Sequence, residues 1–473
     1  MNESKLDRVL HHFLALCALP HPSHHTGAAA AYCCRFAGEH GLFSTMDAAG
    51  NVLIRKAASA GMEDRPGVIL QGHLDMVAEK DPGVTIDFEK DGLDVFREGD
   101  LLGARGTTLG GDDGIAVAMI LAVLEDESLP HPAIEAVFTT DEEVGMLGAD
   151  AMDLSVLRGR RLLNLDSEDE GILTVSCAGG ARVDLSVPGT RTRTAGPLYT
   201  VSVSGLLGGH SGTEIDKGRA NANRLLAELL HGLCGKYPVS LVTFAGGSKD
   251  NAIPNAAECS FYAPAEAASD VERFAAAQKK AYRDADPALA LTYTVAKTST
   301  VAWDAESTRR MVTLLFDIPC GVVAMSADMP GLVETSLNLG IVRTEKGGLA
   351  ATYSVRSSRA AAKEALLSGI RTAAAAAGAD VTVRGDYPAW EYRKESPLRD
   401  TVCRVYRELS GKEMQVVAIH AGLECGIFSS RLPGVECVSF GPDMQNIHTT
   451  RERLSVSSTA RTYELLTQVL AAL

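Results

Sequence analysis

Apolar runs of strand length alternate with helix-like segments in the first third of the chain, and this alternation constrains the fold most. Four runs have the length and composition of strands: residues 51–54, 66–71, 133–139 and 161–166. A glycine-led apolar segment at 114–124 predicts a buried helix between two of them. Strands separated by helices pair in parallel, so the sequence predicts an α/β fold with a mostly parallel sheet flanked by helices. Ligands of such sheets bind beyond the carboxyl ends of the strands.

The pattern changes near residue 186, where alternating strands and amphipathic helices predict a separate α+β domain. This domain is expected to end with an alanine-rich helix at 359–377, after which the first pattern returns with helices at 396–409 and 457–473. No internal repeat is visible. The predicted organisation is a catalytic α/β domain interrupted by an inserted domain: residues 1–185, 186–388 and 389–473.

Charge and composition exclude several classes of partner. The chain of 473 residues has 60 acidic and 45 basic side chains, a formal net charge of −15, which disfavours nucleic acids and anionic membranes. No apolar run approaches the ~18 residues of a membrane span. The ten cysteines are scattered, which is typical of reduced intracellular proteins, and the apolar N-terminal stretch has helical spacing unlike that of a signal peptide. We therefore expect a cytoplasmic protein.

Two segments place polar side chains where ligands would bind. His73 and Asp75 follow a predicted strand two residues apart, hence on the same side, as expected for a metal-ligating histidine and the carboxylate that orients it. A surface pair is the alternative. Asp112 and Asp113 follow two glycines at the start of the predicted helix, where they could be ligands or simply cap the helix.

Further acids and a histidine occur at comparable positions. Asp141, Glu142 and Glu143 follow one strand, Asp166 ends another, and His448 follows an apolar run at 436–440. Three like charges in series repel, so a multivalent cation explains them, although a solvated loop would too. Together, three carboxylates and two imidazoles match a site for two Zn²⁺-like ions with one carboxylate bridging. The histidines at 21, 24 and 25 have no such strand-end position, and we expect a loop there.

The ordered motifs resemble a known family. GHLDMV, GGDDGIA, TDEEVGMLGA and LDSEDEG, followed by a C-terminal histidine, are similar to those of the co-catalytic zinc peptidases, which include carboxypeptidases, aminoacylases and dipeptidases. GGHSG, GRANAN, NAIP, ETSLNLG, GDYPAW and IHAGLECGIF resemble the aminoacyl-histidine dipeptidase (peptidase D, carnosinase-like) branch in particular. The resemblance covers essentially the whole chain.

This resemblance implies the roles of the strand-end residues. The implied metal ligands are His73, Asp112 (bridging), Glu143, Asp166 and His448, with Glu142 as general base and Asp75 orienting His73. The implied cofactors are two divalent ions, Zn²⁺ first, with Mn²⁺ or Co²⁺ also suited to such ligands. The inserted domain would be the family's lid, which in relatives often forms a homodimer interface. Two departures, Asp113 and the HTTRER segment at His448, leave metal and substrate preference open.

Substrate-binding candidates come from the inserted domain and from one C-terminal segment. His210 in LLGGHSG could stabilise the oxyanion, and Arg356 could bind the C-terminal carboxylate of a dipeptide, with Asn251 as a polar contact. Glu424 could recognise a free amino group or be a buried structural carboxylate. The sequence therefore predicts hydrolysis of unblocked dipeptides, of the X-His type with broad specificity. Hydrolysis of N-acyl amino acids and a non-catalytic metal- or peptide-binding paralogue are the alternatives.

Overall fold

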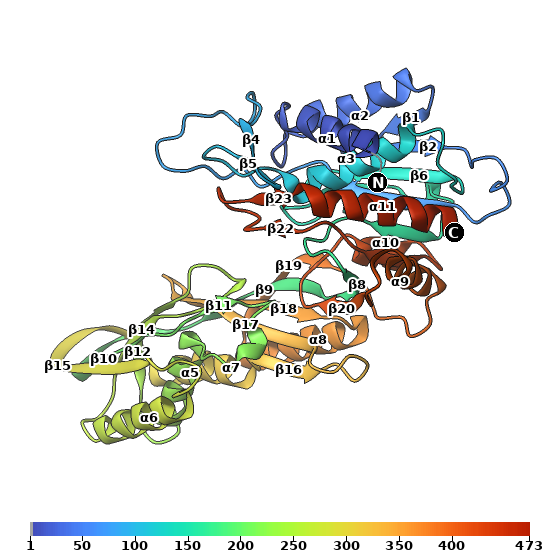
Figure 1. Cartoon of the computed structure of the whole chain (residues 1–473). Helices are drawn as coiled ribbons and strands as arrows, with labels where there is room; N and C mark the ends of the chain where they lie inside the picture. Colours follow the sequence, from blue (N-terminus) through green and yellow to red (C-terminus); the bar gives the residue numbers. More distant parts are fainter. Residues whose placement is uncertain (1–2) are drawn as a thin grey trace. The chain divides into compact units, whose positions relative to one another are not determined.

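The computed structural model describes residues 3–473, which form two compact units (Figure 1). The first unit comprises the chain as far as Cys177 together with Tyr392–Ala418 and Leu423–Leu473. The second comprises Ala178–Glu391 and the short segment Ile419–Gly422. The sequence placed the change of pattern at 186 and 388; that the inserted segment acts as a lid remains a prediction.

The first unit is built on an eight-stranded sheet with the order β1-β2-β6-β3-β7-β21-β8-β20. The strands, in chain order, are β1 Phe43–Met46, β2 Val52–Lys56, β3 Val68–His73, β6 Ile134–Thr139, β7 Arg161–Asn164, β8 Ile172–Cys177, β20 Gln415–Ile419 and β21 Glu436–Ser439. The four central strands, β6, β3, β7 and β21, are parallel, whereas β1, β2 and β8 pair antiparallel with their neighbours. The α/β class is confirmed, with the parallel strands at the centre of the sheet.

The helices of this unit are α1 Glu3–Cys17, α2 Gly27–Glu39, α3 Gly111–Glu125, α4 Leu147–Ala151, α9 Pro397–Ser410, α10 Cys425–Arg431 and α11 Val456–Ala472. The central one is α3, which is buried from Gly111 to Leu124 because it packs between strand β3 and helices α1 and α11 (Figure 1). A helix enclosed on all sides has to be apolar all round, and the run predicted at 114–124 meets this requirement. The start of α3 therefore has a fixed position beside the end of β3.

A smaller four-stranded sheet holds the C-terminal segment that contains His448. Its order is β22-β23-β5-β4, with β4 Val95–Glu98, β5 Leu101–Ala104, β22 Met444–Gln445 and β23 Arg453–Ser455. Strands β22 and β23 form an antiparallel hairpin, so residues 446–452 are its loop.

The second unit contains the same chain topology twice. The inner copy runs β10-α5-β12-β14-α6-β15 and the outer copy β9-α7-β17-β18-α8-β19. In both, the sheet order is fourth, first, third and second strand, which is the split β-α-β arrangement. The inner strands and helices are β10 Arg191–Ser204, α5 Ala222–Cys234, β12 Ser240–Gly246, β14 Ala257–Tyr262, α6 Ala267–Ala281 and β15 Ala290–Trp303. The outer ones are β9 Gly179–Pro188, α7 Ala305–Asp317, β17 Val333–Thr344, β18 Gly348–Ser357, α8 Ala360–Ala377 and β19 Asp380–Tyr387.

The two copies join into one nine-stranded sheet through their second strands, β12 and β17, which pair at Ala245↔Arg343 and Gly246↔Val342. Strand β16 (Gly321–Met325) adds to β17 off this path, and one apolar core extends under both copies. The sequence analysis found no internal repeat, but the topology of the second unit contains one. The repeat is hidden because the inner copy is inserted after the first strand of the outer one.

No helix in residues 3–473 combines the length and the apolar character that a membrane crossing requires.

Candidate metal centre

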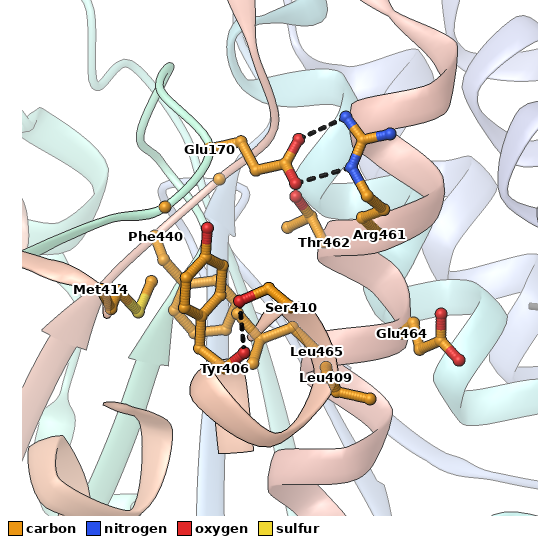
Figure 2. Close-up of a pocket in the computed structure, with 12 residues that line it drawn as sticks. Glu170, Tyr406, Leu409, Ser410, Met414, Phe440, Arg461, Thr462, Glu464 and Leu465 are labelled. Carbon is orange, nitrogen blue, oxygen red and sulfur yellow. Dashed lines mark hydrogen bonds and ion pairs between the residues drawn. The ribbon is translucent and has the colours of Figure 1, made fainter. Parts of the chain in front are cut away.

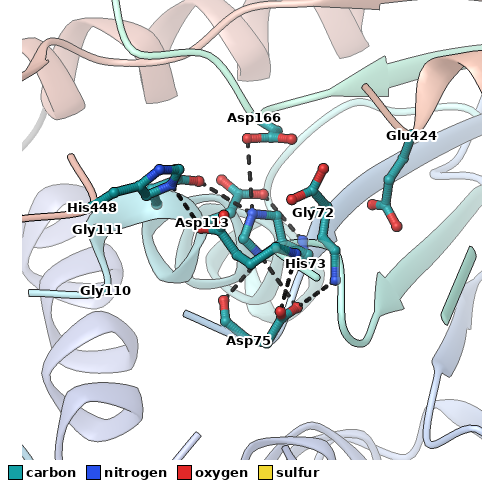
Figure 3. Close-up of polar contacts among 12 residues, drawn as sticks. Gly72, His73, Asp75, Gly110, Gly111, Asp113, Asp166, Glu424 and His448 are labelled. Atoms are coloured by element: carbon teal, nitrogen blue, oxygen red, sulfur yellow. Dashed lines mark hydrogen bonds and ion pairs between the residues drawn. The ribbon is translucent and has the colours of Figure 1, made fainter. Parts of the chain in front are cut away.

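The strand ends named in the sequence meet at one edge of the first sheet. Strand β3 ends at His73, which is in register with Thr139 of β6, and Gln71 of β3 is in register with Asn164 of β7. The acids at 141–143 and at 166 therefore follow neighbouring parallel strands. Figure 3 shows Asp166 and Asp113 near His73, with His448 on the same side of the cluster.

Asp112 occupies the centre of this cluster. Its Oδ1 lies 3.1 Å from His73 Nε2, and its Oδ2 lies 3.0 Å from His448 Nε2. The carboxylate thus presents one oxygen to each imidazole. Asp112 does not cap helix α3, because no side chain of this segment caps the helix. The cap position belongs to Gly110, the residue that directly precedes the helix.

The remaining ligands divide between the two histidines. Glu143 Oε1 lies 2.9 Å from His448 Nε2, and Asp166 Oδ1 lies 3.9 Å from His73 Nε2. Donor atoms around one tetrahedral ion are separated by about 3.3 Å when each bond is about 2.0–2.2 Å, so these spacings suit shared ions. The donors of Asp112, Glu143 and His448 all lie within 4.8 Å of one another.

Unpaired oxygens supply a second test of whether cations fit. Asp113, Asp166 and Glu424 each have one buried carboxylate oxygen without a hydrogen-bond partner among residues 3–473. Burying an unpaired charged oxygen is costly unless a cation or proton compensates it. The donor set, carboxylate oxygens and imidazole nitrogens, is one that Zn²⁺, Mn²⁺ and Co²⁺ accept.

The charges of the cluster perturb one another strongly. Burial alone would lower the pKa of His73, but hydrogen bonds with Asp112 and Asp75 raise it well above its ordinary value. Burial raises the pKa of Asp166 and of Glu142 well above the usual range, and neighbouring carboxylates add to both shifts. Such mutual shifts are typical of functional sites, where positive charge is needed to hold several acids together.

His73 is oriented mainly by a main-chain atom. Its Nδ1 donates to the carbonyl oxygen of Asp75 at 2.9 Å, whereas the carboxylate of Asp75 is 3.5 Å away. This bond leaves Nε2 facing Asp112, as metal-ligating histidines require. The sequence assigned the orienting role to the carboxylate of Asp75, whereas in the structure the carbonyl oxygen of the same residue makes the closer contact with the ring.

The carboxylate of Asp75 instead joins three segments of chain. Its Oδ1 accepts from the main-chain N–H of Glu142 at 2.9 Å, and its Oδ2 accepts from the N–H of Glu143 at 3.3 Å and from the hydroxyl of Ser23 at 2.8 Å. Asp75 is 1% exposed. It therefore fixes the backbone that carries the proposed base and one proposed ligand.

Asp113 is fully buried behind the cluster. Its Oδ2 accepts the main-chain N–H of His73 at 3.1 Å. Burial raises its pKa well above the ordinary value, and the charge of Asp166 adds to the shift. A side chain at Gly72 would meet this oxygen at 2.7 Å, which explains the glycine in the GHLD segment.

Glu424 lies beneath the centre, 0% exposed. Its Oε2 accepts from Gln71 Nε2 at 2.5 Å and from Thr139 Oγ1 at 2.7 Å. Burial raises its pKa to about 7. This environment agrees with the alternative that Glu424 is a buried structural carboxylate. Contact between Glu424 and a substrate amino group stays a prediction.

Three predicted substrate-binding residues lie in the second unit. His210 belongs to the short strand β11 (Gly209–His210), paired with β13 (Ala252–Ile253), and Asn251 directly precedes β13. The ring Nδ1 of His210 accepts from the N–H of Thr213 at 3.2 Å, so Nε2 carries the proton of the neutral ring. Burial, together with the charge of Arg356, lowers the pKa of His210.

Arg356 lies on β18 and is half-buried. Its Nη1 donates to the Tyr387 hydroxyl at 3.2 Å, and its Nε has no hydrogen-bond partner in the part of the chain that the structure describes. A guanidinium with an unused donor is available to an anion.

Sequence reasoning missed two residues at the centre. Ser23 belongs to the loop predicted at residues 21–25; that loop packs beside the site through a bridge between Pro22 and Met76. Glu452 follows His448 by four residues and binds main-chain N–H groups at the start of α3. The glycines at that start were a usable signal, because exposed helix N–H groups without a local cap need an acceptor from elsewhere.

A separate cavity of about 180 Å³ lies in the first unit (Figure 2). Phe440, Met414 and Leu465 line it, and the bidentate ion pair of Glu170 and Arg461 lies at its edge. None of the predicted site residues lines it.

Comparison with known proteins identifies the family. The family model described as peptidase family M20/M25/M40 matches residues 69–472, a range that includes every strand-end residue discussed above. The chain belongs to this family. As an M20/M25/M40 peptidase it is a hydrolase of peptide bonds, and the family resemblance found in the sequence is confirmed.

Individual relatives agree with this assignment. The cytosol non-specific dipeptidase of Escherichia coli (strain K12) is 36% identical over 466 residues, covering 97% of this chain and 96% of the relative. The structure of aminoacylhistidine dipeptidase from Vibrio alginolyticus matches with a TM-score of 0.93 and 33% identity, covering 100% of this M20/M25/M40 peptidase and 97% of that chain. The aminopeptidase PepT of Bacillus cereus, at 17% identity and a TM-score of 0.58 over 98% of each chain, shares the fold.

Proposed function

We propose that this peptidase hydrolyses unblocked dipeptides at a centre of two divalent ions, with X-His dipeptides among its substrates and broad specificity. Two of its relatives are named as dipeptidases, one non-specific and one acting on aminoacylhistidine. The observation that carries the proposal is Asp112, whose two oxygens face one imidazole each at 3.1 and 3.0 Å.

The proposed ligands form two sets that share Asp112. His73 and Asp166 would complete the first set, and His448 and Glu143 the second. When bound, two such ions would lower the pKa of a metal-bound water and polarise the scissile carbonyl.

Glu142 would act as the general base. Its carboxylate oxygen lies within 4.8 Å of a ring nitrogen of His73 and of Glu143, and its main-chain N–H is held by Asp75. Burial raises its pKa well above the usual value for glutamate, and the negative charges of Asp166, Glu424 and Glu143 add to the shift. Glu142 would take the proton of the attacking water and return it to the leaving amine.

Substrate recognition would use the residues of the second unit. The Nε2–H of His210 would donate to the oxyanion, and the guanidinium of Arg356 would bind the C-terminal carboxylate, with Asn251 as a further polar contact. Glu424 is proposed to receive the free amino group through its unpaired Oε1. The inserted unit would close as a lid over the substrate.

Zn²⁺ is the proposed metal, with Mn²⁺ or Co²⁺ as alternatives. A homodimer formed through the inserted unit and a cytoplasmic location are part of the same proposal. The net charge of −15 argues against nucleic acid and anionic membranes as partners.

A substrate panel tests the proposal. Metal-loaded protein is assayed on β-Ala-His, Cys-Gly and N-acetyl amino acids, with metal per chain measured on the same sample. Turnover of the dipeptides with two ions per chain supports it. Turnover of the acylated compounds alone would indicate aminoacylase or carboxypeptidase action, and bound metal without any turnover would indicate a non-catalytic paralogue.

A further inference from the structure

The carboxylate of Glu452 accepts four consecutive main-chain N–H groups at the start of α3. Its Oε2 accepts from Leu109 at 2.7 Å and Gly110 at 3.2 Å, and its Oε1 accepts from Gly111 at 2.8 Å and Asp112 at 3.3 Å. Glu452 is 2% exposed. It supplies from the far end of the chain the cap that the helix lacks locally.

The segment at 109–112 is shaped for this carboxylate. Gly110 has the left-handed backbone angle φ 68°, and a Cβ at Gly111 would meet Glu452 Oε1 at 3.1 Å. The N-terminus of a helix stabilises an anion, and does so more strongly where the site is partly buried than where it is exposed. A negative charge next to the acidic cluster is thus offset by the helix that carries Asp112.

Glu452 also ends the hairpin loop that carries His448. Within that loop, His448 has a left-handed φ of 60° and a side chain that is 45% exposed, so little packing restrains the imidazole. Apart from the contacts of His448 itself, the loop is tied to a distant segment by an exposed side-chain bond from Thr450 Oγ1 to Asp81 at 2.6 Å. The buried tie through Glu452 leads directly to Asp112.

We propose that Glu452 is a positioning residue that sets the spacing between His448 and Asp112 and so controls occupancy of the second ion site. The inference rests on the proposed two-ion centre. The first site depends less on Glu452, because His73 and Asp166 follow strands β3 and β7 of the central sheet and Asp113 holds the backbone of His73.

The test measures metal binding to the full chain. Glu452→Gln keeps the size but places an amide NH₂ against N–H donors, so about half of the cradle is lost. Zn²⁺ titration by equilibrium dialysis should then show one ion bound as in the wild type and the second weakened about 10- to 100-fold, the usual cost of losing a group that supports a metal ligand. Excess metal should restore kcat while KM for the dipeptide stays unchanged. A merely structural role would not produce this site-selective loss.

Thr450→Val is the matched control, because it removes the exposed tie of the same loop; both sites should bind as in the wild type. Thermal unfolding of each variant confirms that it is folded, and Glu452→Asp supplies a second variant that retains the charge. Two ions bound with wild-type affinity in Glu452→Gln, or equal weakening of both, would overturn the proposal.

Hydrogen exchange separates this proposal from the two-ion centre itself. If the wild type binds a single ion, the two-ion proposal fails. The role of Glu452 is still tested, because its replacement should speed amide exchange at residues 109–112. It should also weaken binding of the single ion if His448 is one of the ligands of that ion, and leave the binding unchanged if His448 is not.

Discussion

Replacing Ser23 by alanine should slow catalysis although Ser23 touches no proposed ligand. Its hydroxyl donates to Asp75 Oδ2 at 2.8 Å, and the same carboxylate holds the main-chain N–H groups of Glu142 and Glu143 at 2.9 and 3.3 Å. Ser23→Ala removes one of three donors. We expect Asp75 to turn and carry the backbone of the base with it.

The magnitude follows from the kind of bond. A hydrogen bond to a charged group contributes about 1.5–3 kcal/mol, and the two remaining main-chain donors keep Asp75 partly satisfied. Each 1.36 kcal/mol in the barrier changes the rate tenfold, so full expression of the loss in the transition state lowers kcat about 10- to 100-fold. KM should change little, because the bond does not contact the substrate.

Steady-state kinetics on a dipeptide, together with urea unfolding, measure both effects. Ser23→Thr retains a hydroxyl and should restore most of kcat. The matched control is Ser128→Ala, which removes a comparable bond, from Ser128 Oγ to Asp126 at 2.6 Å, beyond the opposite end of α3. It should lower stability without lowering kcat.

The reasoning is refuted if Ser23→Ala and Ser128→Ala behave alike, with loss of stability and unchanged kcat in both. It is also refuted if Ser23→Thr is as slow as Ser23→Ala.

Three further predictions concern the base, the substrate carboxylate and pH. Glu142→Gln should retain both metal ions, measured by elemental analysis, while kcat falls about 10²- to 10⁴-fold; unchanged turnover would contradict the role of base. Arg356→Lys loses bidentate geometry and should raise KM about tenfold for a dipeptide but not for the dipeptide amide, and equal effects on both would remove the assignment. Burial is the main cause that lowers the pKa of His12 to about 4, with the charges of His11 and His40 adding to it. The unfolded chain therefore takes up this proton first, and stability falls as the pH drops from about 6.5 to about 4. In His12→Gln the loss of unfolding free energy between pH 7 and 4.5 should be smaller by about 2 kcal/mol, measured by urea titration, and an unchanged loss would show that His12 does not titrate in this way.

The sequence predicted the central sheet and the edge at which the candidate metal ligands meet, because both depend on local sequence patterns. Buried parallel strands appear as short apolar runs, and their carboxyl ends necessarily meet, so the polar residues that follow them converge. The regular backbone of helix α3 begins after Asp113, because Asp112 and Asp113 have non-helical backbone angles, so the start predicted at 114 agrees with the structure.

The unpredicted parts depend on contacts distant in sequence. Ser23 and Glu452 bind the site across 52 and more than 300 residues of chain, and nothing in their local sequence indicates the acceptor or donors they meet. The first half of β10 and the whole of β15 were also missed. Strands β10 and β15 pair along 14 residues, and most residues of the two missed stretches are exposed or half-exposed. The first half of β10 lacks the apolar alternation by which a strand is recognised, whereas Leu291, Tyr293 and Val295 of β15 do alternate with threonines and were a usable signal.

The nested arrangement of the second unit bears on how such a chain could grow. The inner copy enters and leaves the outer one at neighbouring points, since Arg191 pairs with Trp303 and the N–H of Asp304 donates to Thr190 at 2.9 Å. A segment whose ends touch can be gained or lost as a block without redirecting the surrounding chain. His210 and Asn251 belong to that block, whereas Arg356 belongs to the surrounding copy. The proposed substrate contacts therefore come from two parts of the chain that can evolve separately. Exchanging the inner copy would replace His210 and Asn251 and leave Arg356 in place, and so could change the substrate specificity.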